Sequence, residues 1–562
     1  MSTSQWRPGR DGRAVRHPGA PGELRLPGRP HRQTRQPGTR QPDPREPELR
    51  LPGPRRPVVV SGGGIAGIAA AVGLAERGID VVLVEKHAQL GGRVRSWPVE
   101  HAGPGGTVDR VTMSRGFHAF FRQYYNLRSL LRRVDPALQN LVAVPDYPLT
   151  LAGSHTDSFA KIPRTPPANL AAFVLGSPSF GLRKLATVNI GTALELLDVR
   201  FPGTYSDYDG QSAAQFLDRL HFPAAARHLA LEVFARSFFA HPEDFSAGEL
   251  VAMFHTYFVG SSEGLLFDVP SDDYDTVLWA PLRDYLENLG ATVYTEATVE
   301  ELDLSAAGSV GVTIGGAAGT TALTAAAVVV ATDPATTRRL VAGSAEPGSP
   351  GPEMSEWRRR LAATGNAPRF AVWRLWLDRS VHADRPAFLG TSGYGALDNV
   401  TVVERFEDGA RRWSASRNGS VVELHAYALP RGSTDAQLQA ELRSQLALVY
   451  PETAAAQIIS SEWLVNADCP LMDTTPWADR PQVPTPDSRI LLAGDGIACD
   501  LPVALMERAA TTGFLAANAL LGRWGLAGHD LWTVPMTGRI AAVGAVRRLV
   551  GYSGYSPRLR SR

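Results

Sequence analysis

The sequence predicts an α/β protein in which a parallel sheet is assembled from distant stretches of the chain, with an α+β domain interleaved between them. Three observations lead to this prediction. An apolar strand at 58–61 runs into a glycine-rich turn and a helix, a second buried strand is expected at 326–331, and a third at 490–493 precedes a long helix. Continuous apolar runs of this kind are typical of parallel strands covered on both faces.

Composition narrows the class of protein. The chain has 562 residues, with 57 Lys and Arg against 56 Asp and Glu, so its net charge gives no reason to expect a nucleic-acid partner. Its two cysteines, Cys469 and Cys499, are too few for a disulfide framework, a cysteine zinc site or a cysteine-ligated iron–sulfur cluster, and no metal site is predicted. The sequence lacks a strongly apolar run long enough to span a membrane. We therefore expect a cytoplasmic protein, in solution or bound to a membrane surface.

Both ends of the chain are basic. Residues 1–56 hold 13 Arg, 11 Pro and 7 Gly, so we expect a disordered extension that takes no part in the fold. An arm that binds RNA or anionic lipid is the less favoured alternative. Residues 538–562 carry six Arg, no acidic residue and an apolar stripe of Ile540, Val543, Val546, Leu549 and Val550. Such a stripe fits either a helix lying on the inner face of the cytoplasmic membrane or a helix docked on the core.

A phosphate-binding turn is predicted directly after the first strand. Gly62, Gly64 and Gly67 form a Gly-x-Gly-x-x-Gly pattern, followed by an Ala-rich helix and a second strand that ends at Glu85. The first glycine permits the tight turn, the second lets the backbone approach a pyrophosphate, and the third allows close helix–strand packing. Glu85 is expected to bind an adenosine ribose. A glycine triplet alone is weak evidence, but the order of strand, turn, helix, strand and acid makes it specific.

Gly91, Gly92 and Arg93 follow the acidic residue by a few positions. Paired glycines with an arginine resemble the second dinucleotide-contacting motif of the flavin amine oxidase and carotenoid desaturase superfamily, which implies FAD rather than NAD. Arg93 would donate forked hydrogen bonds to phosphate or flavin. The alternative is a solvated glycine turn. The fold that the resemblance implies is a discontinuous Rossmann-like FAD-binding domain, of the GR2 type of flavoprotein, with an interleaved α+β substrate-binding domain.

Two later stretches resemble further parts of the same cofactor domain. The strand at 326–331 leads to Asp333, and the strand at 490–493 delivers Gly494-Asp495-Gly496 before the long helix. Read alone, this last triplet would be an ordinary turn. In the superfamily its acidic residue contacts the pyrophosphate–ribityl region, and the helix that follows begins at the isoalloxazine. The cofactor contacts implied by all these motifs are Gly62, Gly64, Ala66, Gly67, Glu85, Gly91, Gly92, Arg93, Asp333, Gly494, Asp495, Leu505 and Met506.

The substrate side is predicted to be apolar and aromatic. Residues 115–125 contain five aromatic residues interspersed with Arg, His and Gln, and 234–267 is rich in Phe and Tyr. Aromatic walls suit a long apolar ligand, and their ring faces stabilise a transient carbocation. For most of 234–267, a well-filled helical core is the better interpretation.

The run Gly-Phe-His-Ala-Phe-Phe-Arg-Gln-Tyr-Tyr-Asn-Leu-Arg at 116–128 resembles the carotene desaturase/methyltransferases of actinobacteria, which are the isorenieratene or carotenoid φ-ring synthases. Residues 264–267 and 278–282 are similar to that family as well, and the resemblance spans about 57–525. The extension 1–56 lies outside the family's pattern.

This resemblance implies an FAD-dependent enzyme that acts on a long apolar carotenoid. A β-ring carries two methyl groups on one quaternary carbon, which blocks aromatisation by desaturation alone. Hydride loss to the flavin, migration of one methyl group, proton loss and a second desaturation would give the arene. Val108-Asp109-Arg110 interrupts the approach to Gly116, where this chain departs from the family.

His118 and Glu507 are the candidate catalytic residues. His118 lies in the shared aromatic run and could act as acid or base, although a histidine in such a segment is more often a structural hydrogen-bonding group. Glu507 and its neighbour Arg508, early in the helix that begins at the flavin, are comparable candidates. Cys499 is expected only to pack.

The sequence is divided as follows: a disordered extension at 1–56, FAD-binding parts at 57–135, 261–345 and 481–525, a helical substrate- or membrane-facing region at 136–260, a substrate-binding sheet at 346–480, and a basic tail at 526–562. The alternatives are another FAD-dependent desaturase, isomerase or amine oxidase of the same fold, and a flavin- or carotenoid-binding protein without turnover. The sequence does not identify the electron acceptor, the oligomeric state or a φ- rather than a χ-ring product.

Overall fold

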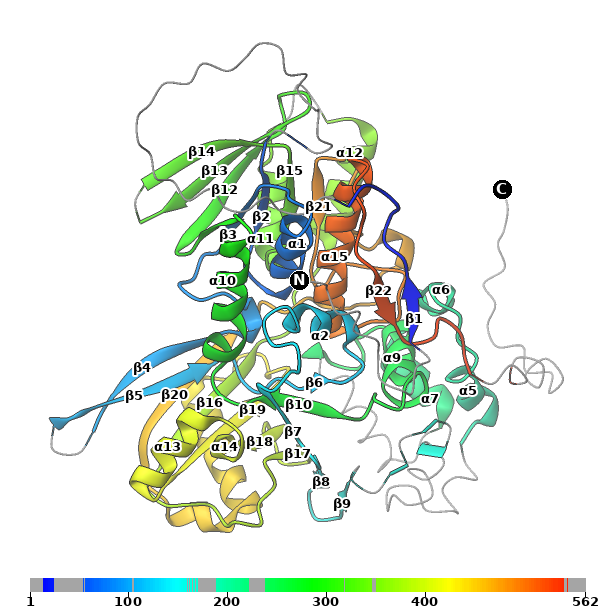
Figure 1. Cartoon of the computed structure of the whole chain (residues 1–562). Helices are drawn as coiled ribbons and strands as arrows, with labels where there is room; N and C mark the ends of the chain where they lie inside the picture. The colour runs from blue at the N-terminus through cyan, green and yellow to red at the C-terminus, as the bar shows by residue number, and fades with distance from the viewer. Residues whose placement is uncertain are drawn as a thin grey trace.

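The computed structural model describes residues 14–24, 54, 56–103, 106–158, 160, 162–163, 165–166, 168–169, 188–221, 238–317, 319–345, 350–539 and 543. Figure 1 shows two main lobes, one built on a parallel sheet and the other on an antiparallel sheet, with a helical group beside them.

A five-stranded parallel sheet forms the first lobe, which confirms the predicted α/β fold. Its strands come from distant parts of the chain and lie in the order β11-β3-β2-β15-β21. Their bounds are β2 (Val58–Ser61), β3 (Val81–Val84), β11 (Thr292–Tyr294), β15 (Ala327–Val330) and β21 (Ile490–Leu492). Every residue of β2 and β15 is buried, because helices and a second sheet cover both faces.

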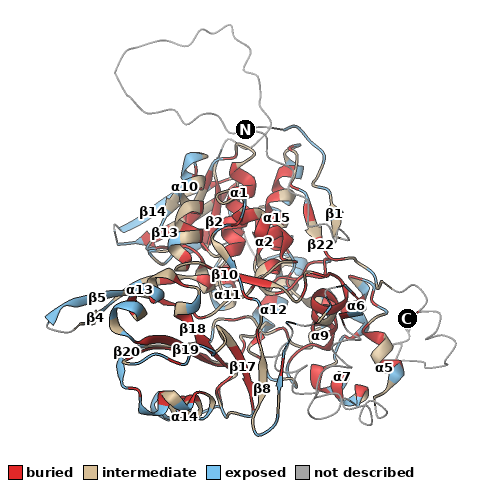
Figure 2. Ribbon diagram, turned by 60° about the horizontal axis from the view of Figure 1, so that its bottom comes forward, coloured by how far each residue is buried: buried red, intermediate tan, exposed pale blue. Residues whose placement is uncertain are grey.

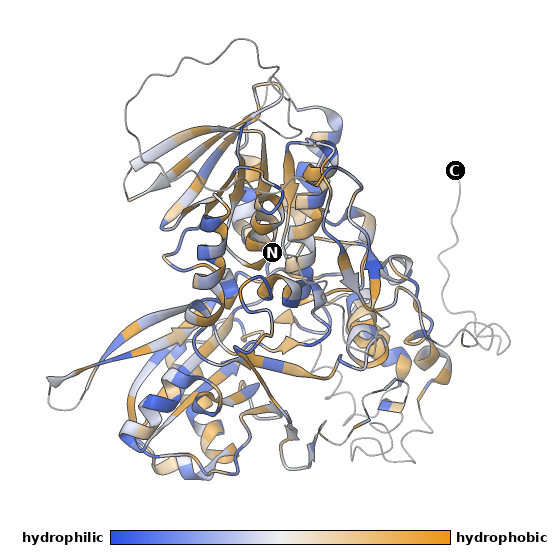
Figure 3. Ribbon diagram, in the orientation of Figure 1, coloured by the Kyte–Doolittle hydropathy of each residue, from blue (hydrophilic) through white to orange (hydrophobic). Residues whose placement is uncertain are grey.

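Two helices cross the parallel sheet in close contact (Figure 1). Helix α1 (Ile65–Ala75) follows the glycine turn and is buried along its whole length, and α15 (Leu505–Arg523) follows β21. Figure 2 shows both helices and β2 as one buried block, and Figure 3 shows that hydrophobic residues dominate it. The block is covered further by α10 (Ala280–Asn288), α11 (Pro334–Ala342), α12 (Pro352–Ala363) and the sheet of β12 (Ala297–Asp303), β13 (Val310–Gly316) and β14 (Gly319–Ala325).

A seven-stranded sheet forms the second lobe, in the order β20-β16-β19-β18-β17-β8-β9. Most of its strands lie in the predicted substrate-binding region: β16 (Phe370–Leu377), β17 (Phe388–Ser392), β18 (Asn399–Val402), β19 (Ser420–Ala426) and β20 (Ile458–Asn466). Helices α13 (Asp408–Arg417) and α14 (Asp435–Val449) pack on it.

The prediction of a helical region at 136–260 is wrong for its first part. There the chain forms β7 (Leu141–Ala143), β8 (Leu149–Leu151) and β9 (Thr156–Asp157), and β8 pairs in parallel with β17 at the edge of the large sheet. Strands of two or three residues are too short to show an alternation of polar and apolar residues. They form because a neighbouring strand pairs with them, which the sequence does not show. The helices that the structure describes come later: α5 (Ile190–Glu195), α6 (Gly203–Asp207), α7 (Ala213–Leu220) and α9 (Ala247–Phe254).

The segment between the two lobes contains the aromatic run. After β3, the chain makes the hairpin of β4 (Ser96–Ala102) and β5 (Val108–Ser114), which projects from the body in Figure 1. It then forms β6 (Phe120–Phe121) and α2 (Tyr125–Leu131). Strand β10 (Phe267–Pro270) pairs with both β6 and β7, and the three form a separate small sheet.

The prediction that all of 1–56 lies outside the fold is wrong for residues 14–24. Strand β1 (Val15–His17) pairs antiparallel with β22 (Leu531–Thr533), and the Arg16 guanidinium lies 2.7 Å from the Asp530 carboxylate. These partners come more than 500 residues later in the chain, so the composition of the segment gives no sign of them. Among the described residues, no helix has the length and apolar character needed to cross a bilayer. Apart from Val543, the predicted C-terminal stripe lies outside the described residues.

Candidate active site

The glycine turn after β2 is built by close backbone contacts. Gly62 has a φ of +104°, and a Cβ there would lie 2.5 Å from the carbonyl oxygen of Ala331. A Cβ on Gly67 would lie 1.8 Å from the Gly62 carbonyl oxygen, so α1 can meet the turn only through a glycine. A Cβ on Gly64 would meet the Gly92 Cα at 3.7 Å, an ordinary contact distance, and the Gly91 N–H donates to the Gly63 carbonyl oxygen at 2.8 Å. The two glycine motifs are thus in direct contact, and both line one cavity.

Glu85 lines the same cavity beside the two glycine motifs. Its carboxylate accepts hydrogen bonds from the backbone N–H groups of Gly63 (2.7 Å) and His87 (2.9 Å), which fixes the side chain at the end of β3. Burial raises the pKa of Glu85, and the two backbone donors oppose that shift. A carboxylate held in this way can accept hydrogen bonds from the hydroxyl groups of a ribose.

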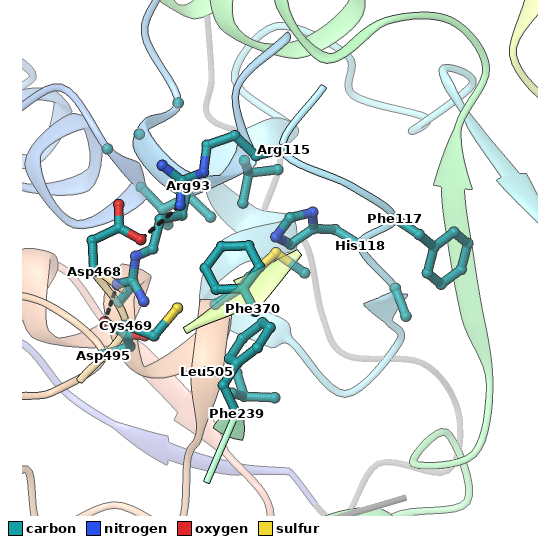
Figure 4. Close-up of a pocket in the computed structure, with 18 of the residues that line it drawn as sticks. Arg93, Arg115, Phe117, His118, Phe239, Phe370, Asp468, Cys469, Asp495 and Leu505 are labelled. Atoms are coloured by element: carbon teal, nitrogen blue, oxygen red, sulfur yellow. Dashed lines mark hydrogen bonds and ion pairs between the residues drawn. The ribbon is translucent and has the colours of Figure 1, made fainter. Parts of the chain in front are cut away.

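Ion pairs hold the opposite wall. Arg93 pairs with Asp495, and Arg115 pairs with Asp468 at 2.7 Å (Figure 4). Gly91 has a φ of +101°, and a Cβ there would lie 2.3 Å from the indole nitrogen of Trp279. The glycine is therefore required for the tight packing of the Arg93 loop.

Asp333 lies at the start of α11, beside the glycine turn. It caps this helix by accepting the Thr336 N–H at 3.0 Å, and Lys86 lies 3.6 Å away. Although burial alone would raise the pKa of Asp333, the bonds from Thr336 and the charge of Lys86 lower it.

A cavity of about 420 Å³ brings most of the predicted contacts together. It is lined by Gly62, Gly64, Ala66, Glu85, Gly91, Gly92, Arg93, Asp333, Gly494, Asp495, Leu505 and Met506, and by His118. Gly67 does not line it and acts through packing instead. The cavity continues from these residues to an aromatic wall formed by Phe117, Phe121, Phe239, Phe267, Phe370 and Phe388.

His118 faces the cavity near Phe370 (Figure 4). Its Nδ1 lies 2.8 Å from the Gly116 carbonyl oxygen. Because a carbonyl oxygen can only accept a hydrogen bond, Nδ1 carries the proton. Burial lowers the pKa of His118 to about 4, which keeps the ring neutral at pH 7 with a lone pair on Nε2. The side chain is thus both a structural hydrogen-bonding group and an available weak base.

Two residues with a left-handed backbone line the same cavity. Phe239 has a φ of +57° and Leu505 a φ of +53°, in a region that a non-glycine residue enters only at an energetic cost. Figure 4 places both side chains at the edge of the cavity, with Phe370 nearby. Backbone strain of this kind is concentrated at functional sites.

The structure removes Glu507 from the catalytic candidates. It does not line the cavity, and its two oxygens accept the N–H groups of Asn126 (2.8 Å) and Leu127 (2.9 Å) in the first turn of α2. Arg508 is equally occupied, because its guanidinium pairs with the buried Glu249 at 2.6 Å. Glu507 follows Met506, which lines the cavity, in helix α15. Because successive residues of a helix point about 100° apart, the Glu507 carboxylate lies on a different side of the helix from Met506.

Sequence reasoning missed several polar residues of the cavity, which are Arg115, Asn399, His425, Tyr427, Asp468 and Cys469. It also missed Glu423, which lies behind the cavity wall and bonds to His425. Burial raises the pKa of the Cys469 thiol to about 11, so it remains protonated beside Arg93. One signal was available. In the strand Ser420–Ala426, polar residues alternate with apolar ones, which is the pattern of a strand that faces the core on one side and a polar site on the other.

Residues 65–521 match the family of flavin-containing amine oxidoreductases. The chain belongs to this family. Among its relatives, a carotenoid phi-ring synthase from Streptomyces griseus is 53% identical over 486 residues, which cover 86% of this chain and 92% of that protein. A carotenoid phi-ring synthase from Chlorobaculum tepidum is 26% identical over 603 residues, covering 86% of this chain and 91% of that protein. The predicted membership in the carotenoid φ-ring synthase group of this superfamily is confirmed.

Solved structures of two other enzymes agree with the fold. Cyclohexylamine oxidase from Brevibacterium oxydans superposes with a TM-score of 0.58 at 15% identity, covering 84% of this chain and 99% of its own. Reduced UDP-galactopyranose mutase gives a TM-score of 0.59 at 14% identity, covering 83% and 94%. The predicted cofactor and enzyme class are therefore confirmed: the chain is a flavin-dependent oxidoreductase that uses FAD.

The residues of this chain fit FAD. Gly62, Gly64 and Gly92 line the cavity at the start of α1, where a pyrophosphate would meet backbone without Cβ atoms and where the helix dipole favours negative charge. Glu85 would hold the adenosine ribose, and Arg93 with Asp495 would lie beside the pyrophosphate and ribityl chain. Leu505 and Met506, in the first turn of α15, would lie against the flavin ring.

Proposed function

We propose that this flavoenzyme desaturates the β-rings of a carotenoid and aromatises them with migration of one methyl group. The observation that carries the proposal is a single cavity that joins the FAD-contacting glycines and Arg93 to a wall of aromatic side chains. The relatives that are carotenoid phi-ring synthases and zeta-carotene desaturases support a carotenoid substrate.

The aromatic wall suits this substrate and its chemistry. Phe117 stacks on Phe388 with ring centroids 4.5 Å apart, and Phe239 lies 4.7 Å from Phe370. Such rings bury an apolar ligand with few rotamers to immobilise, exclude water and stabilise a ring cation through their faces. FAD, when bound, supplies the acceptor for hydride. The protein holds the ring beside it and accepts the protons.

Hydrogen and carbon balance define the product. In each desaturation, one hydrogen leaves as hydride to the flavin and one leaves as a proton, so an aromatised ring loses four hydrogens and keeps every carbon. His118 is a candidate proton acceptor, since its Nε2 has a lone pair and lies in the cavity. Because the flavin must be reoxidised between desaturations, the reaction needs an external electron acceptor.

The test is expression in a β-carotene-producing bacterial host, followed by mass spectrometry of the extracted pigment. We expect a product that has lost four hydrogens per processed ring with all carbons retained. A Gly67→Val variant, which blocks closure of the phosphate turn, serves as the matched inactive control. Unchanged β-carotene with a purified protein that holds FAD would contradict the proposal.

The fold of amine oxidases supports a second candidate, oxidation of amines. It predicts anaerobic bleaching of the bound flavin by soluble amines, which the carotenoid proposal does not. An isomerase of the same fold would convert a carotenoid with no net loss of hydrogen, so the mass measurement separates it as well.

We also propose that the enzyme works in the cytoplasm at the inner face of the cytoplasmic membrane, where a carotenoid dissolves. The basic segment 538–562 supports this by its composition. Flotation with vesicles that contain anionic lipid tests it: binding that is lost when Arg547 and Arg548 are both changed to Gln is the expected result.

A further inference from the structure

A row of three polar side chains follows one face of β19 into the cavity. Glu423 and His425 lie in the strand and Tyr427 comes directly after it, so all three project from the same side. The alternate residues Val422, Leu424 and Ala426 pack into the hydrophobic core on the opposite side. His425 and Tyr427 line the cavity. A hydrocarbon ligand cannot form hydrogen bonds with these side chains. Substrate binding therefore does not explain why they are in the cavity.

Hydrogen bonds connect the row from end to end. The Tyr427 hydroxyl lies 2.6 Å from His425 Nδ1, and His425 Nε2 lies 2.8 Å from Glu423 Oε1. Although burial alone would raise the pKa of Glu423, Arg374 at 2.8 Å lowers it to about 2, so this carboxylate is ionised. Two groups approach His425 Nε2: the ionised Glu423 carboxylate at 2.8 Å and the Phe117 N–H at 3.2 Å. The shorter, charged contact assigns the His425 proton to Nε2, so that Nδ1 accepts the hydrogen bond from the Tyr427 hydroxyl.

The row reaches the cavity beside His118. The Phe117 N–H lies 3.2 Å from His425 Nε2, and a Cβ on Gly116 would be only 2.6 Å from the His425 ring. The Tyr427 ring meets Phe239 edge-on at 4.8 Å, and the Asn399 amide donates to the Tyr427 oxygen at 3.0 Å. The hydroxyl group is thus held at a fixed place in the aromatic wall.

The cluster behind the row balances an added proton. Arg374 lies between Glu423 and Glu407, which is 3.5 Å away on its other side. Burial raises the pKa of Glu407 to about 7, so this carboxyl group is only partly ionised at neutral pH. A proton that arrives at His425 lies 2.8 Å from the ionised Glu423 carboxylate and is therefore not an isolated buried charge. His118 bonds through Nδ1 to the Gly116 carbonyl oxygen, no carboxylate of the described residues lies within hydrogen-bond distance of its ring, and burial disfavours its charged form.

We propose that Tyr427 accepts the proton that leaves the ring after methyl migration, backed by His425 and Glu423 as positioning residues. This rests on the proposed function. The ring C–H bond breaks and its electron pair becomes a ring double bond, while the proton goes to the Tyr427 oxygen. The hydroxyl proton of Tyr427 passes at the same time to His425 Nδ1, and Glu423 stabilises the resulting imidazolium. The hydride removed beforehand has reduced the flavin, so electrons and protons balance.

The test compares two rates in the purified FAD-loaded enzyme, mixed anaerobically with β-carotene in detergent. Flavin bleaching reports hydride removal, and mass spectrometry of quenched samples reports the loss of further hydrogen from the ring. For Tyr427→Phe we expect bleaching within about 3-fold of the parent and completed desaturation slower by roughly 100-fold, a usual size for general-base catalysis. Glu423→Gln should also slow completed desaturation more than bleaching, but by a smaller factor. Tyr450→Phe, which also removes a buried hydroxyl group but lies away from the cavity, is the matched control.

Each outcome bears on the proposal. An equal fall of both rates in Tyr427→Phe and Glu423→Gln would assign the row a structural role and overturn it. It would also be overturned by unchanged rates in both variants, or by a split that appears in His118→Gln and not in Tyr427→Phe. If the parent enzyme forms no aromatic ring in the β-carotene-producing host, where electron acceptors are present, the proposed function fails first, a result visible before any variant is examined. Because Glu423→Gln probes the same row without altering the cavity wall, a misfolded Tyr427→Phe does not prevent a decision.

Discussion

Three buried glutamates illustrate how surroundings decide the role of one residue type. Glu85 accepts two backbone N–H groups at the edge of the cavity, Glu423 is held ionised by Arg374, and Glu507 caps the first turn of α2 without a neighbouring cation. Burial raises the pKa of Glu507 to about 8, whereas the pKa of Glu423 falls to about 2. The sequence shows three carboxylates but none of these partners, and for that reason it favoured Glu507 as a catalyst and overlooked Glu423.

Glu507→Gln tests the structural role assigned to that residue. The folded state binds the Glu507 proton more tightly than the unfolded chain, because its pKa rises from 4.5 to about 8. Stability from this group is present below pH 4.5 and is lost as pH rises toward 8, by up to about 1.4 kcal/mol per pH unit. The Gln variant has one oxygen fewer to accept the α2 N–H groups, which costs about 1–3 kcal/mol of unfolding free energy. Its amide does not titrate, so the variant does not share the parent's loss of stability as the pH rises. We therefore expect its deficit in melting temperature to shrink between pH 5 and pH 8, with kcat per bound FAD unchanged.

Glu452→Gln provides the control for this pH series. The hydrogen bonds from Arg385 lower the pKa of Glu452 to about 2, so it stays ionised throughout the same pH range. Its deficit should be constant from pH 5 to pH 8. A constant deficit for Glu507→Gln as well, or a fall in its kcat at full FAD occupancy, would contradict the capping role.

At the scale of elements, the sequence predicted best where local pattern and tertiary role agree. The strands β2, β15 and β21 and the helices α1 and α15 were predicted within a few residues, because glycines and continuous apolar runs mark their ends. Strands β7, β8 and β9 were missed, since each has two or three residues and pairs with a partner far away in the sequence. In β19 the alternation of polar and apolar residues is visible in the sequence. The charge state of its polar residues, however, depends on Arg374 in the neighbouring strand β16, which the sequence does not place there.

The contact between α1 and α15 makes a prediction at this scale. A Cβ on Gly513 would lie 2.2 Å from the Ala66 carbonyl oxygen, so Gly513→Ala must push the helices apart. We expect a loss of about 1–3 kcal/mol of unfolding free energy and weaker FAD binding, because the first turns of both helices line the cavity proposed to hold FAD. Gly522→Ala, in the exposed last turn of α15, is the control and should be neutral or slightly stabilising. Melting temperature and the ratio of flavin to protein absorbance measure both effects, and equal behaviour of the two variants would contradict the argument.

At the scale of the whole molecule, segments from opposite ends of the chain pair with each other and hold α2 against α15. The Asn126 side chain in α2 bonds both the N–H and the carbonyl of Trp532 in β22, and it donates to Thr511 in α15. Strand β1 pairs with the other edge of β22. The parallel sheet was predictable because its motifs are local, but this arrangement was not, because it depends on backbone pairing between residues about 500 positions apart.

Removal of β1 should therefore weaken the cofactor lobe. A chain that begins at residue 26 loses the β1–β22 pairing and the Arg16–Asp530 ion pair, whereas one that begins at residue 13 keeps both. We expect the shorter chain to lose on the order of 2 kcal/mol of unfolding free energy and to release FAD faster, since β22 no longer holds Asn126 firmly against α15. Gly19→Val in the full chain should act in the same direction, because a Cβ there would lie 2.4 Å from the Gly528 backbone. Equal melting temperatures and equal FAD release from the two truncated chains would show that the pairing of β1 contributes nothing to the site.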